Sequence, residues 1–265
     1  MGHMHDVGGE RIALIGAGAI GTALLRINSA SDAPLSIVGV LTRSERPNAH
    51  AIPVVTDVQQ LLALRPAVVA EAAGHDALRA HGATILRSGS DLLIVAIGAL
   101  ADPATEREMR GAAEEGGSKL QIVSGALGAL DALAAASVDG LRRVVHTTRK
   151  PPASLLPADE AAALVEPRVL YHGSAREAAA LFPESINVAA AVSMAGIGFD
   201  ATEVQVIADP AVTRNQHTVE AEGAFGNLTF RIENIPSAEN PRTGTLTAMS
   251  LLHALRRRSA RVLIG

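Results

Sequence analysis

The chain has 265 residues, enough for one large domain or for two modest domains that share a core. Apolar residues make up 48% of it, which excludes a disordered chain. The formal net charge is −4, and the chain has neither a basic domain nor the stacking aromatic residues of single-strand binders, so we expect no nucleic-acid partner. The absence of cysteine excludes disulfides and thiolate metal sites, and it fits a cytoplasmic protein without a metal.

No segment of the sequence has the pattern of a membrane or export signal. The longest apolar runs, such as residues 92–100, are too short to cross a bilayer. The first ten residues carry His3, His5 and Asp6 where a signal peptide would have a basic and then an apolar region. We therefore expect no membrane association and assign no function to this start.

In the first half of the chain, short apolar runs alternate with helical patterns, which is typical of a parallel, doubly wound sheet. The core must be aliphatic, since the chain has one Tyr, four Phe and no Trp. Strands are predicted at residues 11–15, 35–41, 54–55, 67–72, 91–97 and 120–124, and helices at 20–29, 57–64, 76–88 and 103–116.

After Gly125 the pattern changes to alternating or β-rich runs, which predict an α+β domain with a mixed or antiparallel sheet. These runs are residues 141–148, 188–192, 203–208, 217–223 and 227–234. Residues 149–157 are rich in proline and are interpreted as a loop. A helical period returns at residues 243–258, with basic residues at its end, where they suit the helix dipole.

The glycine turn Gly16-Ala-Gly18-Ala19-Ile20-Gly21 follows a predicted strand and opens a predicted helix, the context in which this motif binds a dinucleotide. Gly16 permits the tight turn, Gly18 admits the pyrophosphate to the backbone, and Gly21 brings the helix onto the strand. The alternative is an ordinary glycine-rich turn.

The sequence therefore predicts an α/β fold: a Rossmann-type doubly wound parallel sheet, a second α+β domain, and a C-terminal helix that returns to the first domain. We place the dinucleotide-binding domain at residues 1–124 plus 239–265. The α+β domain, for substrate binding and dimerisation, is placed at residues 125–238.

The end of the second strand bears on the choice between NAD and NADP. An acidic residue there would bind the ribose 2′-hydroxyl, but the strand ends in Thr42-Arg43-Ser44. Arg43 can pair with a 2′-phosphate, and Thr42 and Ser44 can donate hydrogen bonds to it. We expect NADP to be accepted; the alternative is that Arg43 is a solvated loop residue.

Two histidines lie where a ligand can reach them. His75 ends the segment that follows the strand at residues 67–72, and we interpret it as a polar loop residue or a neighbour of the helix start. His217 lies where a loop enters an alternating run, so its imidazole can face a cleft and act as a base near neutral pH. A lone histidine is more often structural, and the residues alone leave that alternative open.

Several segments resemble matching stretches of the L-aspartate dehydrogenases, in that family's order and over most of the chain. They are GAGAIG (residues 16–21), SGALGALDAL (124–133), HTTRKPP (146–152), INVAAAVSMAG (186–196), ADPAVTRNQH (208–217) and ENPRTGTLTAMSLL (239–252).

The resemblance implies NAD(P)-dependent oxidation of L-aspartate through iminoaspartate to oxaloacetate and ammonia, and the reverse amination. In some members the iminoaspartate feeds NAD biosynthesis. The family's catalytic histidine falls on His217, and its cofactor contacts fall on Ala126 and Asn187. A homodimer through the sheet of the second domain is implied as well.

A dicarboxylate substrate needs fixed positive charge, for which Arg149, Lys150 and Arg242 are the candidates, although each can equally be a solvated surface charge. His217 would serve as general base for the addition of water and later as acid when ammonia departs. We expect deamination to rise with pH through a pKa of about 6.5 unless the site shifts it.

Three other functions remain open. An imine reductase similar to dihydrodipicolinate reductase would share the two-domain plan, but its usual pair of adjacent histidines is absent here. A homoserine-dehydrogenase-like enzyme fits less well. A regulatory protein that binds NAD(P) without turnover is the alternative from another class, and neither a DNA-reading module nor a basic face supports it.

Overall fold

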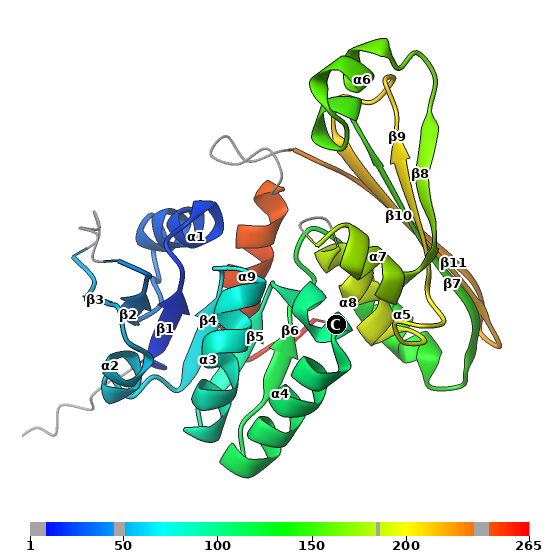
Figure 1. The fold of residues 1–265 in the computed structure, drawn as a ribbon. Coiled ribbons are helices and arrows are strands. Elements are labelled where there is room, and N and C mark those ends of the chain that lie inside the picture. Colours follow the sequence, from blue (N-terminus) through cyan, green and yellow to red (C-terminus); the bar gives the residue numbers. More distant parts are fainter. Residues whose placement is uncertain (1–8, 45–50, 184–185, 236–243, 265) are drawn as a thin grey trace, which may run out of the picture.

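The structure is a computed structural model that describes residues 9–44, 51–183, 186–235 and 244–264, and it contains two β-sheets (Figure 1). The first sheet has six strands in the order β3-β2-β1-β4-β5-β6, and all its pairings are parallel. Its strands are β1 (Ile12–Ile15), β2 (Ile37–Leu41), β3 (Val54–Val55), β4 (Val68–Glu71), β5 (Asp91–Ile94) and β6 (Leu120–Ile122).

Helices cover both faces of this sheet, as the doubly wound prediction requires. On one face the buried cluster includes Leu78, Ile85 and Met109, from α3 and α4. On the other face it includes Leu24 and Leu251, from α1 and α9. The helices of this part are α1 (Ala19–Ser29), α2 (Val58–Ala63), α3 (His75–Arg87), the 3₁₀ helix η1 (Ile97–Ala101), α4 (Pro103–Gly116) and α9 (Thr245–Arg257).

Local chemistry fixes the ends of these helices, as α4 illustrates. The Asp102 carboxylate accepts hydrogen bonds from the amides of Ala104 and Thr105, and Pro103 occupies the first turn, where no amide donor is needed. Gly117 ends the helix in the left-handed conformation, with a φ of 60°. The sequence prediction for this helix is therefore confirmed at both ends.

The second sheet has five strands in the order β11-β10-β7-β9-β8. It is mixed, because β7 and β9 run parallel while the other neighbours run antiparallel. The strands are β7 (Leu141–Lys150), β8 (Arg168–Ser174), β9 (Glu203–Ala208), β10 (Asn215–Gly223) and β11 (Gly226–Asn234). Its helices are α5 (Leu130–Ser137), the 3₁₀ helix η2 (Pro152–Ser154), α6 (Ala158–Ala163), α7 (Ala175–Leu181) and α8 (Asn187–Ala195).

Two predictions for this half are wrong. Residues 188–192, expected as a strand, form the middle of α8, where Val188 and Val192 are one helical turn apart and the alanines between them are buried. The loop expected at residues 149–157 begins two residues later, because β7 continues through Arg149 and Lys150.

The C-terminal helix α9 packs against α1 and contributes to the core of the first sheet. Leu251 and Leu255 are almost fully buried there, and burial of such a side chain stabilises a fold by roughly 1.5–3 kcal/mol. Figure 1 shows α7 and α8 between the second sheet and the first. Within the described residues, every helix is too short or too polar to span a bilayer.

Candidate functional site

The turn between β1 and α1 has the geometry of a phosphate-binding turn. Gly16 adopts a φ of +97°, and a Cβ on Gly21 would lie 2.2 Å from the carbonyl oxygen of Gly16, so only glycine allows this close contact of helix and strand. A Cβ on Gly18 would meet no described atom within 4 Å, and no side chain caps the helix that follows. The free amides and the open space at Gly18 therefore fit a dinucleotide pyrophosphate.

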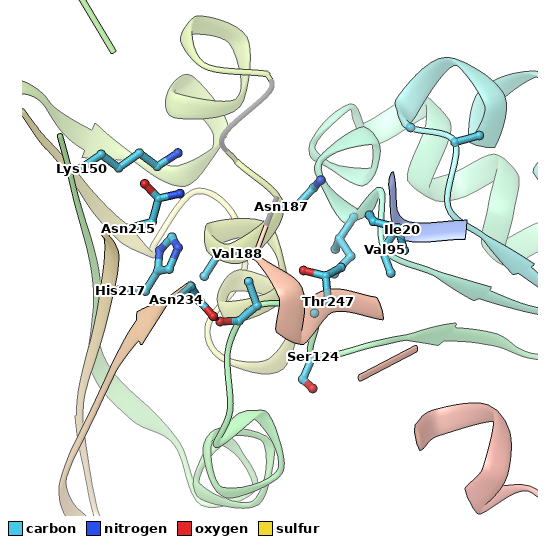
Figure 2. A pocket seen from close by; sticks show the side chains of 16 residues that line it. Ile20, Val95, Ser124, Lys150, Asn187, Val188, Asn215, His217, Asn234 and Thr247 are labelled. Carbon is cyan, nitrogen blue, oxygen red and sulfur yellow. The ribbon is translucent and has the colours of Figure 1, made fainter. Parts of the chain in front are cut away.

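A cavity of about 430 Å³ lies between the carboxyl ends of the first sheet and one face of the second. Figure 2 shows Lys150, Asn215 and His217 on one side of it and Ile20 and Val95 on the other. Its lining residues are Ile20, Ala73, Gly74, Val95, Ile97, Ser124, Gly125, Ala126, Lys150, Asn187, Val188, Asn215, His217, Asn234, Gly244 and Thr247.

His217, on β10, forms a buried pair with His146 on β7. The Nδ1 atom of His217 lies 3.2 Å from Nε2 of His146, and the two rings stack with their centroids 5.4 Å apart. Among the described residues, Nδ1 of His146 has no hydrogen-bond partner. Since Nδ1 of His217 is engaged by His146, the Nε2 atom is the ring nitrogen of His217 left for the cavity.

Burial keeps both imidazoles neutral. Desolvation and the nearby charge of Lys150 lower the pKa of His146 to about 3. Desolvation, followed by His146 and Lys150, lowers the pKa of His217 well below 6.5. The site therefore shifts the pKa of His217 away from the ordinary value of about 6.5, and His217 is an uncharged base or donor at neutral pH.

Other polar side chains of the second sheet face the same cavity because they alternate along their strands. His217 pairs in register with Thr148, so Lys150, two residues further along β7, lies on the same face of the sheet as His217 and as Asn215, two residues before His217 on β10. Asn234, at the end of β11, donates a hydrogen bond of 2.8 Å to the carbonyl oxygen of Ala126. The sheet thus presents an ammonium group, an amide and an imidazole side by side to one cavity.

Asn187, the first residue of α8, joins the two halves of the cavity. Its Oδ1 atom accepts a hydrogen bond of 2.9 Å from the amide of Gly98 in η1, and it lies 2.9 Å from Nε2 of His75. Asn187 is drawn among the lining residues in Figure 2.

Glu71, at the end of β4, is a fully buried carboxylate that holds two loops of the cavity wall. Its Oε1 accepts from the amides of Ala73 and Gly74, and its Oε2 accepts from those of Val95 and Ala96. Burial raises the pKa of Glu71, and the four backbone hydrogen bonds oppose that rise.

The sequence-predicted site residues separate into three groups in the structure. Ile20, Ala126, Lys150, Asn187 and His217 line the cavity. Gly16, Gly18, Ala19 and Gly21 form the adjacent turn at the start of α1. Arg43 is exposed beyond β2, away from the cavity lining, and Arg242 lies outside the described residues.

Arg149 does not share the cavity with Lys150. Since β7 continues through both residues, their side chains point to opposite faces of the sheet. Arg149 forms an ion pair of 2.6 Å with Asp209 on the far face, and this pairing lowers the pKa of Asp209. The expectation that Arg149 binds the substrate together with Lys150 is therefore wrong.

Comparison with known proteins connects this geometry to a family. Residues 131–258 match the family model of the aspartate dehydrogenase C-terminal domain, and residues 16–122 match that of the NAD-binding domain of homoserine dehydrogenase. The chain is 43% identical to the L-aspartate dehydrogenase of Ruegeria pomeroyi, over 95% of this chain and 94% of that one. The chain belongs to the L-aspartate dehydrogenase family.

Solved structures agree with this assignment. The aspartate dehydrogenase of Thermotoga maritima superimposes with a TM-score of 0.80 and 27% identity, over 97% of this chain and 99% of that chain. A dihydrodipicolinate reductase from Paenisporosarcina shares the fold with a TM-score of 0.54 at 13% identity, over 93% and 94% of the two chains. The family assignment and the Rossmann-type domain expected from sequence are thus both confirmed.

Several residues around this dehydrogenase site were missed by the reasoning from sequence. His146 and Asn234 lie in alternating segments, and the period of two places His146 on the face of Lys150, but only the pairing of β7 with β10 brings it to His217. Glu71 carried a signal of its own, because a carboxylate within an otherwise apolar buried strand needs partners.

Proposed function

We propose that this member of the family oxidises L-aspartate with NAD(P)+ and water to oxaloacetate, ammonia and NAD(P)H, and catalyses the reverse amination. The observation that carries the proposal is the cavity itself. It joins the glycine-turn side of the first sheet to the buried His217 and the ammonium of Lys150. A cofactor and a small anionic substrate can meet there.

The residues of the cavity have separate roles in this proposal. Lys150 supplies positive charge for a substrate carboxylate, as a dicarboxylate requires. A nicotinamide held beside Ala126 and Asn187 would supply the acceptor for the hydride that leaves Cα of aspartate, which would give the iminium form of the substrate. His217 takes a proton from the attacking water as it adds to that carbon, and returns a proton to the nitrogen as ammonia leaves.

The low pKa of His217 suits the base step. A neutral imidazole has a free lone pair, whereas an imidazolium would repel the cationic iminium. Burial above all, and then the proximity of His146 and of Lys150, favour the neutral form. His217 is thus unprotonated across the neutral pH range, as a general base must be, and the same low pKa makes it a weaker base.

We also propose that NADP is accepted alongside NAD. The first three residues after β2, Thr42-Arg43-Ser44, carry no acid, and Arg43 is exposed where the adenosine ribose of a Rossmann domain lies. The Thr42 hydroxyl donates a hydrogen bond of 2.7 Å to the carbonyl oxygen of Ser44, which shapes this loop. A guanidinium group there can pair with a 2′-phosphate.

A homodimer through the second sheet and a cytoplasmic location remain proposals. The sheet face opposite the cavity is hollowed and carries half-buried polar residues such as Thr147, Gln205 and Thr218. A second copy of the chain is the partner we propose for this face. The absence of cysteine is the feature that supports a reducing compartment.

The deciding experiment measures absorbance in the reduced-nicotinamide band with L-aspartate and NAD+ or NADP+ in turn, and with oxaloacetate, ammonia and NADPH for the reverse. We expect turnover of aspartate and little with other amino acids. Reduction of a cyclic imine without aspartate turnover would favour the reductase alternative. Tight cofactor binding with no absorbance change across an amino-acid panel would favour a regulatory protein.

A further inference from the structure

The contacts of Asn187 determine the orientation of its amide group. The two ends of an asparagine amide are hard to distinguish by shape, but hydrogen-bond partners can assign them. The backbone amide of Gly98 is always a donor, and it lies 2.9 Å from Oδ1 of Asn187. The atom in that position must therefore be the oxygen, because a nitrogen there would set one donor against another.

The same oxygen determines the protonation of His75. Nε2 of His75 lies 2.9 Å from Oδ1, which is an acceptor only. Nε2 of His75 must accordingly carry a hydrogen. With Gly98 and His75 as donors, the two lone pairs of Oδ1 are both used, and the Nδ2 group of Asn187 is left as a donor on the side of the cavity that Asn187 lines.

The hydrogen bonds of Asn187 depend on close packing around Gly98, which leaves no room for a side chain at that position. A Cβ on Gly98 would lie 2.3 Å from Cγ2 of Ile186 and 2.8 Å from Nε2 of His75. Only glycine lets η1, α3 and the start of α8 come this close. The three partners come from distant parts of the chain, so the junction fixes the start of α8 against the first sheet.

We propose that His75 is a positioning residue that holds Asn187 so that its amide Nδ2 faces the cavity as a fixed hydrogen-bond donor to the cofactor. The ligand atom is an acceptor oxygen on the nicotinamide-riboside half of the dinucleotide. The glycine turn takes the pyrophosphate and the end of β2 takes the adenosine, so the loops after β4 and β5 are left for that half. The proposal rests on the proposed function only in that the cavity binds NAD(P).

Three variants of the full chain test the role of His75 by fluorescence titration with NADPH and NADH. His75→Phe keeps a ring but removes the donor, and we expect the dissociation constant to rise about 5- to 10-fold, the scale of one lost hydrogen bond. His75→Gln offers an amide donor at a similar reach and should recover most of that loss. Asn187→Asp still accepts from Gly98 and His75 but loses the donor toward the cavity, so it should bind at least as weakly as His75→Phe while its melting temperature stays near that of the wild type.

The wild-type protein supplies a readout that does not depend on any variant folding. Nitrogen-15 NMR of the histidine side chains should show His75 protonated at Nε2, and an Nδ1-H tautomer would overturn the proposal. Unchanged NADPH affinity in a folded His75→Phe would overturn it as well. Neither measurement involves aspartate, so a failure of the aspartate assay would refute the proposed function and leave the role of His75 to be decided by these results.

Discussion

At the scale of single residues, the surroundings of His217 decide which protonation state meets the substrate. Because burial lowers its pKa well below 6.5, the rise of deamination with pH should be complete before neutrality. His217→Ala should lower kcat for aspartate by about 10²-fold or more, the usual scale for a lost proton-transfer group, and leave NADPH binding nearly intact. Turnover and melting temperature measured on one preparation check this. A destabilised variant with near-native kcat would show that His217 is structural.

Arg43 offers a second test at this scale, because it is exposed and does not line the cavity. Arg43→Ala should raise the KM for NADP+ about 10-fold or more, as expected for a lost charge-assisted contact, and change the KM for NAD+ little. Arg26, in the last turn of α1, provides a control arginine. Equal losses with both cofactors would show that Arg43 does not read the 2′-phosphate.

At the scale of elements, the glycines of the turn before α1 divide into structural and binding positions. Gly18 has a φ of −79° and open space around it, so Gly18→Val should fold but obstruct the pyrophosphate and raise the dissociation constant for NAD(P)H at least about 10-fold. Gly16 has a φ of +97°, and its Cβ would lie 2.8 Å from the Ala72 carbonyl oxygen. The main effect of Gly16→Ala should therefore be a lower melting temperature, in contrast to the weaker cofactor binding expected for Gly18→Val. Calorimetry that finds normal NAD+ binding in Gly18→Val would refute this placement of the dinucleotide.

Glu71 acts on two loops together, since its carboxylate accepts from the amides of both β4–α3 and β5–η1. In Glu71→Gln one acceptor oxygen becomes an NH2 group that faces backbone donors. We expect the free energy of unfolding to fall by about 1–3 kcal/mol, the cost of buried unsatisfied groups. Chemical denaturation measures it, with Glu108→Gln on the exposed side of α4 as the matched control. Equal stability of the two variants would show that Glu71 does not hold the two loops together.

At the scale of the whole molecule, the buried histidines couple stability to pH. The pKa of His146 is about 3 in the folded protein and 6.5 as its ordinary value, so between these values the unfolded chain binds more protons. The free energy of unfolding should therefore fall as the pH drops below 6.5, with a slope of up to about 1.4 kcal/mol per pH unit for one histidine.

Replacing the histidine isolates its share of that slope. His146→Phe should be less dependent on pH than the wild type between about pH 6.5 and 5, a window above the ordinary range of most carboxyl groups. The comparison between variants removes the opposite contribution of Glu71, whose pKa burial raises. His253→Gln, at an exposed position, is the matched control. Parallel stability curves for wild type and His146→Phe would contradict the prediction.

Structure that depends on contacts between residues close in sequence was predictable, and structure that depends on contacts between distant residues was not. Strands such as β9 and helices such as α4 were found because period and capping are local signals. The segment 188–192 was wrongly expected to be a strand, because valine favours strands locally. Its burial among helices instead stabilises the helix α8. The end of β7 was predicted too early. Because the strand continues through Arg149 and Lys150, their side chains point to opposite faces of the sheet.

The glycine turn was predictable from its own motif, and most of the remaining site was predictable only where the resemblance to a known family supplied it. His217, Asn187 and Ala126 were assigned by motif, and the structure places all three at one cavity. The pairs His146–His217 and His75–Asn187 depend on strand pairing and on the position of α8, which no local pattern encodes. Their roles follow from tertiary contacts alone.

The return of α9 to the first domain has a consequence for biosynthesis. Leu251 and Leu255 complete a core that begins with Ile12 and Leu24, but the ribosome makes the entire second sheet between them. While it is being made, the nascent first sheet has α1 without α9 on that face, and apolar surface stays exposed until α9 emerges. A domain whose core is completed by so distant a segment cannot close before that segment is made, and such long-range closure is slow and prone to aggregation. Chaperones that shield nascent chains should therefore matter more for this protein than for one whose nucleotide-binding domain is continuous in sequence.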